Sequence, residues 1–331
     1  MTLGDTSFPV RTGDTVLIPP GSAHCIGAGF DWHESCAAQW RMQRTSVRTP
    51  SSHGRYDATR RISRMTDLGP RLAAGGTAEL FAWEGARVVK LYWEGATMDA
   101  AEREAARTRA AREAGAPAAQ VFDVVKVGGR PGVVFEKLDG ALMLDAVCAH
   151  PERMEEFAAE LARLQASLHQ LPCEALPPQR EHMTRRVQLG PLPARVKPGV
   201  VQILRDLPDQ RMVCHGDLHP GNVILTADGP RLIDWFDATA GCPAADLART
   251  CLLLNYARLA TGANPRRAAF DALRAQFVDL FLQRYREILP EPAQTLAEWM
   301  PPVAAARIAE PISGQERSAL LRMIETLLTA A

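Results

Sequence analysis

Lysine is scarce in this chain of 331 residues, whose 38 basic residues include only Lys90, Lys126, Lys137 and Lys197. A lysine inside an apolar segment is therefore more informative here than in an average protein. The chain also lacks an excess of either charge, because 38 acidic residues balance the basic ones. A formal net charge of zero gives no electrostatic reason to expect a nucleic acid as the main partner.

Long apolar runs and paired cysteines are missing as well. No apolar run reaches the ~18 residues of a membrane-spanning helix, and the first residues lack the basic and apolar regions of a signal peptide. None of the seven cysteines forms a C-x-x-C pair, which favours reduced, buried thiols. These absences predict a cytoplasmic protein without a membrane partner, and they leave its oligomeric state open.

The remaining composition is that of a globular protein, with 47% hydrophobic and 23% charged residues. At ~150 residues per domain, the length predicts two domains or one bilobal one. Residues 1–64 differ from the rest, because two short strand candidates precede a stretch, 41–64, that holds seven arginines and one acid. Such a stretch is typical of a solvated linker and less often of a binding patch.

From residue 65 the pattern becomes regular. Short strand candidates bounded by turn residues, with one intervening helix at Met98–Ala114, predict a strand-rich lobe over residues 65–137. The strand candidates are Arg71–Ala74, Glu79–Trp83, Ala86–Tyr92, Gln120–Val127 and Gly132–Lys137. Residues 138–331 are mainly helical in pattern, with helices expected near 244–260, 267–288, 293–308 and 315–330.

The segment 213–234 interrupts the helical part and carries the strongest chemical signal. Asp217 stands five residues before Asn222 in a loop that leads into a strand, and a second strand ends at Asp234. Phosphoryl transfer needs a carboxylate that orients the attacking hydroxyl, and a second carboxylate with an amide oxygen that hold Mg²⁺. A polar turn between two core strands is the simpler alternative, but three polar groups in register disfavour it.

The sequence HGDLHPGN at 215–222, followed by IDW at 233–235, resembles the catalytic loop and metal-binding segment of the aminoglycoside phosphotransferase family. The segment GCPAADLA at 241–248 resembles the one that follows in that family. The resemblance covers about residues 65–331. It implies an α+β, bilobal, protein-kinase-like fold, with a small antiparallel-sheet lobe before residue 138 and a mainly helical lobe after it.

The resemblance also implies roles for single residues. Asp217 would be the catalytic base, and Asn222 and Asp234 would bind Mg²⁺. His215 and Asp246 would support the loop. The implied activity is transfer of the γ-phosphoryl group of ATP to a hydroxyl of a small molecule, such as an aminoglycoside, an amino alcohol or a sugar.

Lys90 lies on an otherwise apolar strand, where an ammonium group needs an anionic partner. In the kinase-like fold such a lysine binds phosphates and pairs with a helical glutamate. Both Glu102 and Glu104 are candidates, but the neighbours of Glu104 on a helical wheel are small residues that can approach a sheet. Helical geometry therefore favours Glu104, and a surface charge pair suits Glu102 better.

Two further segments are candidates for nucleotide binding. Gly75, Gly76 and Thr77 form a turn whose backbone amides can bind phosphates, although the G-x-G-x-x-G pattern of protein kinases is absent. Glu136 and Leu138 lie where the resemblance implies the hinge whose backbone binds adenine. For the Glu136 side chain, a solvated surface position is the alternative.

The acceptor is not identified by the sequence. Trp299 and Glu310, in the helical tail, are candidates for a cationic acceptor pocket, with a core tryptophan and a surface glutamate as the alternatives. The absence of D-F-G and A-P-E segments disfavours a protein kinase. A non-catalytic nucleotide-binding pseudokinase is the second hypothesis, although all of the expected polar positions are present.

A separate resemblance concerns the first residues. Gly13, Pro19, Gly21 and His24 have the spacing of the second motif of cupin β-barrels, in which the histidine binds a metal. The first cupin motif and its ligands are absent, and one ligand does not make a metal site. A cupin-like fragment is therefore favoured over a metal sensor.

Overall fold

The computed structural model describes residues 68–256, 265–290 and 293–330 and, before them, only the short strands β1 (Thr2–Leu3), β2 (Thr6–Ser7), β3 (His24–Cys25) and β4 (Ile62–Ser63). The contacts divide the chain into two compact units, Met1–Val47 and Arg48–Ala331. In the first unit, β1, β2 and β3 form an antiparallel sheet in the order β2-β1-β3. The side chains of the cupin-like motif and of segment 41–64 lie outside the described residues, so both interpretations stay predictions.

A six-stranded sheet in the order β4-β8-β9-β7-β6-β5 forms the first lobe of the second unit. Its further strands are β5 (Arg71–Ala74), β6 (Ala78–Trp83), β7 (Arg87–Tyr92), β8 (Val121–Val127) and β9 (Arg130–Glu136). All neighbours pair antiparallel except β4, which runs parallel to β8. Strand β7 is paired on both sides, and Lys90 faces Leu80 on β6 and Val133 on β9. The register therefore fixes Lys90 in the interior of the sheet.

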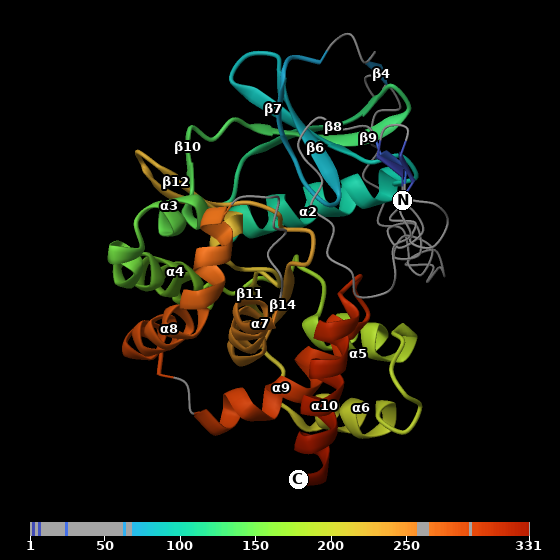
Figure 1. Cartoon of the computed structure of the whole chain (residues 1–331), viewed down its shortest axis with the longest axis vertical. Helices are drawn as coiled ribbons and strands as arrows, with labels where there is room; N and C mark the ends of the chain where they lie inside the picture. The colour runs from blue at the N-terminus through green and yellow to red at the C-terminus, as the bar shows by residue number, and fades with distance from the viewer. Residues whose placement is uncertain are drawn as a thin grey trace. The chain divides into compact units, whose positions relative to one another are not determined.

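Helix α2 (Met98–Glu113) lies along this sheet (Figure 1). Its buried face is formed largely by alanines, of which Ala101, Ala105 and Ala111 have no exposed surface. Small side chains let a helix approach a sheet closely, and alanine also has the highest helix propensity. Glu104 lies on the same face with 1% of its surface exposed. The alanine face therefore brings a carboxylate into the protein interior.

The chain passes from the first lobe into a small antiparallel sheet. Strand β10 (Gly140–Leu142) pairs with β12 (Val223–Thr226), which pairs in turn with β13 (Gly229–Leu232). Strand β11 (Met212–Cys214), which precedes this hairpin in the chain, pairs with β14 (Thr239–Gly241), which follows it. The segment 213–234 is thereby held by strands from three parts of the chain.

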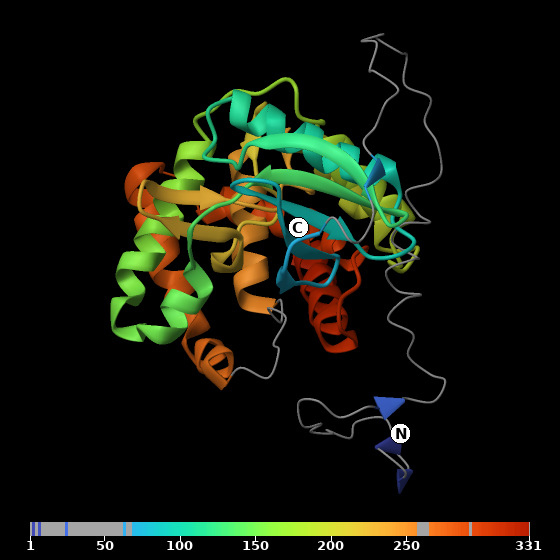
Figure 2. The same ribbon diagram turned by 90° about the horizontal axis from the view of Figure 1, so that it is seen from above.

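Helices form most of the second lobe, as Figures 1 and 2 show. They are α3 (Met143–Ala149), η2 (Pro151–Arg153), α4 (Met154–Leu168), α5 (Gln179–Leu189), α6 (Lys197–Asp206), η3 (Pro220–Asn222), α7 (Pro243–Tyr256), α8 (Pro265–Ile288), α9 (Ala293–Ile308) and α10 (Gly314–Ala330). Helix α4 packs against α8, and α9 packs against α7 and α10. Trp235 and Trp299, each 1% exposed, are the largest side chains in the core between them.

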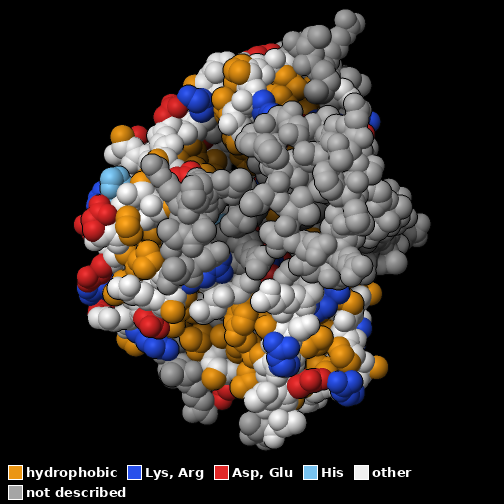
Figure 3. Space-filling view, in the orientation of Figure 1, with side chains coloured by type: hydrophobic (Ala, Val, Ile, Leu, Met, Phe, Trp, Pro, Cys, Tyr) orange, Lys and Arg blue, Asp and Glu red, His pale blue; other side chains and the backbone are white. Residues whose placement is uncertain are grey.

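The expected elements agree closely with the observed ones. The strand candidates correspond to β5 to β9, the expected helix to α2, and the helices expected after residue 243 to α7 to α10. Strand β10 was not expected, because three residues are too few for a period-2 pattern to show. Across the described residues, no helix has both the length and the apolar character needed to cross a membrane. Charges of both signs alternate over the described surface on the face shown in Figure 3.

Gly140 tests the pairing of β10 with β12. A Cβ atom on Gly140 would lie 2.3 Å from the carbonyl oxygen of Leu225 on β12. Gly140→Ala should therefore force β10 and β12 apart and lower the free energy of unfolding by about 1–3 kcal/mol, the usual cost of overpacking. Denaturation by urea measures the effect.

Gly76→Ala is the matched control, because a Cβ there has no heavy atom within 4 Å. Its stability should stay close to that of the wild type. Equal stabilities of the two variants would contradict the close approach of β10 and β12.

Candidate active site

The loop after β11 is fixed by one buried carboxylate. Asp246, in the first turn of α7, accepts hydrogen bonds from the backbone N–H groups of His215 (3.2 Å) and Gly216 (2.7 Å). Its own position is set by the Nε2 atoms of His169 (3.1 Å) and Gln165 (3.0 Å). Burial acts to raise the pKa of Asp246, but the hydrogen bond and charge of His169, with the other donors, hold it below its usual value. Asp246 is thus an ionised anchor for the start of the loop.

Asp217 and Asn222 face each other across this loop. The Asn222 Nδ2 atom donates to the backbone oxygen (2.8 Å) and to the Oδ2 atom (3.1 Å) of Asp217. Both amide hydrogens are thereby used, and the side-chain oxygen remains as the atom that can bind a cation. The Asp217 side chain is 28% exposed, so its carboxylate is accessible to a ligand.

Lys90 connects the two lobes. Its Nζ atom lies 2.8 Å from Glu104 Oε1 and 3.1 Å from Asp234 Oδ1. Tyr92 donates a further hydrogen bond to Glu104 Oε2. Burial acts to lower the pKa of Lys90, but the charges of Asp234 and Glu104 raise it well above its usual value. The ammonium is therefore charged and binds to Glu104; Glu102 is not its partner.

Asp234 has an unusual backbone. Its φ of 64° makes it the only residue other than glycine with a positive φ among the described residues. Such a conformation costs about 1–3 kcal/mol and is concentrated at functional sites. His215 supports this segment, because its Nε2 atom lies 3.1 Å from the oxygen of Ile233 and its ring packs on Trp235. Burial acts to raise the pKa of Asp234, but Lys90 outweighs it, and the pKa lies below its usual value.

A cavity of about 430 Å³ opens beside Lys90 and Asp234. Apolar side chains from both lobes line it, namely Leu72, Leu80, Val88, Phe135, Ile224 and Ile233. The turn of Gly75, Gly76 and Thr77 also lines it. Trp93 holds this turn, since its Nε1 donates to the oxygen of Gly75 (3.1 Å) and its backbone N–H to the oxygen of Thr77 (3.2 Å). The cavity thus combines an apolar slot with a polar end.

The segment between the lobes forms one edge of the cavity. The Glu136 carboxylate binds Arg231 of β13, and the Glu136 N–H donates to the oxygen of Gln120 (2.9 Å). Leu138 also lines the cavity, and within the described part of the chain no backbone hydrogen bond is donated by its N–H. The backbone at Leu138 is therefore available to a ligand, whereas the Glu136 side chain pairs with Arg231.

Sequence reasoning missed a group of charged residues on the other side of Asp217. Arg249 of α7 donates from Nε to the oxygen of Gly216 (3.0 Å), and its Nη2 lies 3.7 Å from Asp217 Oδ1. Glu310, a candidate for a cationic acceptor pocket, is 8% exposed and binds Arg249. Trp299 lies in the core. No signal distinguished Arg249, because the sequence has 34 arginines.

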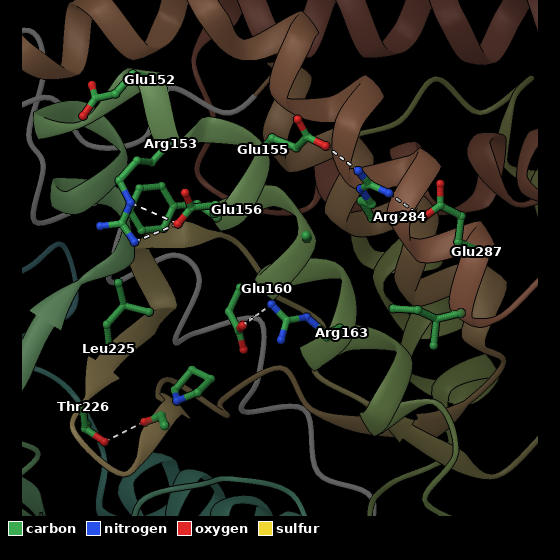
Figure 4. Close-up of a pocket in the computed structure, with 15 residues that line it drawn as sticks. Glu152, Arg153, Glu155, Glu156, Glu160, Arg163, Leu225, Thr226, Arg284 and Glu287 are labelled. Atoms are coloured by element: carbon green, nitrogen blue, oxygen red, sulfur yellow. Dashed lines mark hydrogen bonds and ion pairs between the residues drawn. The ribbon is translucent and has the colours of Figure 1, made fainter.

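A second hollow, of about 830 Å³, lies between α4, the β12–β13 hairpin and α8 (Figure 4). None of the predicted site residues lines it. Its arginines pair with neighbouring glutamates, as Arg153 does with Glu156 and Arg284 with Glu287 (both 2.8 Å). This hollow lacks the convergent polar groups of the cavity beside Lys90.

Comparison with solved structures shows the same architecture. A thermostable mutant of aminoglycoside phosphotransferase APH(4)-Ia is similar with a TM-score of 0.55 and 15% identity over 80% of this chain and 94% of that one. The amicoumacin kinase hAmiN gives 0.51 and 15%, over 81% and 90%. A choline/ethanolamine kinase family protein from Mesorhizobium loti gives 0.51 and 16%, over 79% and 87%. These likenesses confirm the α+β, protein-kinase-like fold.

Residues 71–288 match the sequence profile of the phosphotransferase enzyme family. The chain belongs to that family, which makes it a small-molecule kinase. No curated protein matches the sequence significantly. The resemblance found from the motifs at 215–248 is therefore confirmed at the level of the family.

Asp246 tests the anchoring of the loop. Asp246→Asn should lower the free energy of unfolding by about 3 kcal/mol at neutral pH. The amide is uncharged and has only one acceptor oxygen, so it cannot replace the carboxylate that accepts from two backbone N–H groups and His169. The folded-state pKa lies below the ordinary 3.8, so this stabilisation is present above pH ~4 and is lost as the pH falls through the folded value. Denaturation by urea at neutral and acidic pH measures both effects.

Asp139→Asn is the control, because the Asp139 side chain is 79% exposed and, among the described residues, forms an ion pair with Lys137 alone. It should change stability by less than about 0.5 kcal/mol. A similar loss in both variants would show that Asp246 does not anchor the loop.

Proposed function

We propose that this protein transfers the γ-phosphoryl group of ATP to a hydroxyl of a small-molecule acceptor. The observation that carries the proposal is the position of the Lys90 ammonium, 2.8 Å from Glu104 and 3.1 Å from Asp234 at the polar end of the cavity. A fixed cation in a cavity that is also lined by a glycine turn suits polyphosphate, although the Gly75 N–H already donates to the oxygen of Ala78 (2.9 Å). At least three of the similar solved structures contain AMP-PNP, which makes ATP the expected donor.

The cavity has a place for each part of ATP. The flat faces of adenine are apolar and suit the apolar lining to which Val88 and Ile233 contribute. The polar edge of adenine needs backbone partners such as the Leu138 N–H. The triphosphate would extend toward Lys90 and the turn at Gly75 to Thr77. Glycines in this turn let the backbone approach phosphate closely.

The residues present fit a Mg²⁺ site. Asp234 uses Oδ1 for Lys90, and Asn222 uses its amide hydrogens for Asp217. The second oxygen of Asp234 and the side-chain oxygen of Asn222 are the hard ligands that Mg²⁺ prefers. A cation held there neutralises the charge of the phosphates during transfer.

Asp217 is the proposed catalytic base. Its carboxylate is held by Asn222 and is accessible to an acceptor. The acceptor oxygen forms a bond to the γ-phosphorus, its proton passes to Asp217, and the bond from the γ-phosphorus to the bridging oxygen breaks to release ADP. His215 and Asp246 keep Asp217 in place through the loop backbone.

Lys90→Ala tests the nucleotide site. Loss of the ammonium leaves the phosphates without their fixed cation, so the affinity for ATP with Mg²⁺ should fall by about tenfold or more. Calorimetric titration measures it. Lys126→Ala is the control, because Lys126 is exposed on β8 and should leave the affinity unchanged. Equal affinities of wild type and Lys90→Ala would exclude this assignment.

Asp217→Asn and Asp234→Asn separate the two acidic roles. Asp217→Asn should lower turnover by roughly 10²–10⁴ while ATP still binds, because only proton transfer is affected. Asp234→Asn should lose both turnover and the Mg²⁺ dependence of nucleotide binding. Acceptor-dependent ADP release and calorimetry measure these effects.

The opposite pattern, in which Asp217→Asn abolishes Mg²⁺-dependent binding and Asp234→Asn does not, would show that the roles are reversed. A pseudokinase would give no acceptor-dependent ADP release even in the wild type.

A further inference from the structure

A cluster of arginines begins at Asp217, whose Oδ1 lies 3.7 Å from Arg249. The cluster contains four arginines from four helices and three acidic residues. The arginines are Arg107 of α2, Arg186 of α5, Arg249 of α7 and Arg307 of α9, and the acids are Asp237, Glu310 and Glu316. The cluster therefore carries one positive charge in excess, which the Asp217 carboxylate balances when no acceptor is bound.

The acids of this group are already bound to arginines. Glu310 lies 2.6 Å from Arg186 and 2.8 Å from Arg249, and it also pairs with Arg307. Asp237 lies 2.6 Å from the second Nη atom of Arg186. Burial acts to raise the pKa of Glu310, but its three arginines hold it far below its usual value. Glu316 lies 2.9 Å from Arg307. None of the three carboxylates is therefore free to bind an ammonium group of an acceptor.

Arg107 differs from the other three arginines. It donates a hydrogen bond to the backbone oxygen of Phe236, directly before Asp237. Among the side chains that the structure describes, none of the carboxylates forms an ion pair with Arg107. Burial, with the charges of Arg103 and Arg186, holds the pKa of Arg107 below its usual value although Asp237 opposes this. A largely buried guanidinium without a carboxylate is costly unless an anion approaches it.

The pKa of His182 is affected by the arginines of this group. It lines a small hollow of about 50 Å³ beside the catalytic loop, together with Arg186 and Arg249. Burial and the charges of Arg186, Arg107 and Arg249 hold the pKa of His182 well below its usual value. The ring is therefore neutral at physiological pH, so His182 adds no charge to the group of arginines and acids.

From this arrangement we infer that the acceptor is a hydroxyl compound that carries a carboxylate or a phosphate group. The anion would bind the Arg107 guanidinium beside Arg186, with the reactive hydroxyl at Asp217. This inference rests on the proposed function and narrows its acceptor class. Among the described residues of this group, a polycationic amino sugar would instead meet four arginines and, apart from Asp217, only carboxylates that are already paired, so it is disfavoured by repulsion.

Binding of four compounds of similar size tests the inference. Glucose, glucosamine, gluconate and glucose 6-phosphate are titrated into the full chain, with and without AMP-PNP and Mg²⁺, and their affinities are measured by ligand-observed NMR. At least one anion, gluconate for a carboxylate site or glucose 6-phosphate for a phosphate site, should bind about tenfold or more tightly than glucose. Glucosamine should bind most weakly.

Arg107→Gln should remove most of this preference for the anion, because it removes the charge and keeps much of the side chain. Arg109→Gln is the matched control, since Arg109 lies on the same helix but on a different face and should retain the preference. Anions that bind no more tightly than glucose, glucosamine that binds as tightly as they do, or a preference that survives Arg107→Gln would each overturn the inference.

Acceptor-dependent ADP release is measured in parallel with the same compounds and with hydroxyl compounds of other sizes. Its absence with every compound would contradict the proposed function. The order of binding affinities alone decides the charge class of the acceptor, so the two failures are distinguishable.

Discussion

The ammonium group of Lys90 is the charge on which the site depends. Its side chain is 17% exposed, and it meets two carboxylates, Glu104 from α2 and Asp234 from the segment after β13. Taking such an ion from water costs several kcal/mol unless close counter-charges compensate it. Without Lys90 the two carboxylates would repel each other across the lobes. The same group that joins the lobes is therefore the one placed to meet the phosphates of a nucleotide.

The second lobe uses buried acids for a different purpose. Asp246 accepts hydrogen bonds from the loop backbone, and Glu310 binds arginines from three helices. Both carboxylates are structural. Asp246 holds the loop directly, and Glu310 holds it through Arg249, which donates to the oxygen of Gly216, so neither is available to a ligand. Asp217 remains as the accessible acid on that side. This division explains how a site rich in charge can keep one accessible carboxylate close to several arginines.

The polar segment 213–234 and the pairing of Lys90 with Glu104 could be predicted because they rest on short-range patterns. The spacing of Asp217, Asn222 and Asp234 reflects one hairpin, and the alanines around Glu104 reflect one helix face. The arginine cluster could not be predicted, because Arg186 meets Asp237 across 51 residues and Glu310 across 124. Such contacts depend on how α5, α7 and α9 pack, and nothing local in an arginine-rich sequence marks them.

A crystal structure of the full chain with AMP-PNP and Mg²⁺ would show directly whether Lys90 and Asp234 meet the nucleotide. We expect phosphate oxygens within hydrogen-bond distance of Lys90, and adenine against the backbone at Leu138. We also expect oxygens of Asn222 and Asp234 to coordinate the metal, with the γ-phosphorus facing Asp217. A nucleotide bound elsewhere, or one in this cavity whose phosphates point away from Lys90 and Asp234, would contradict these expectations.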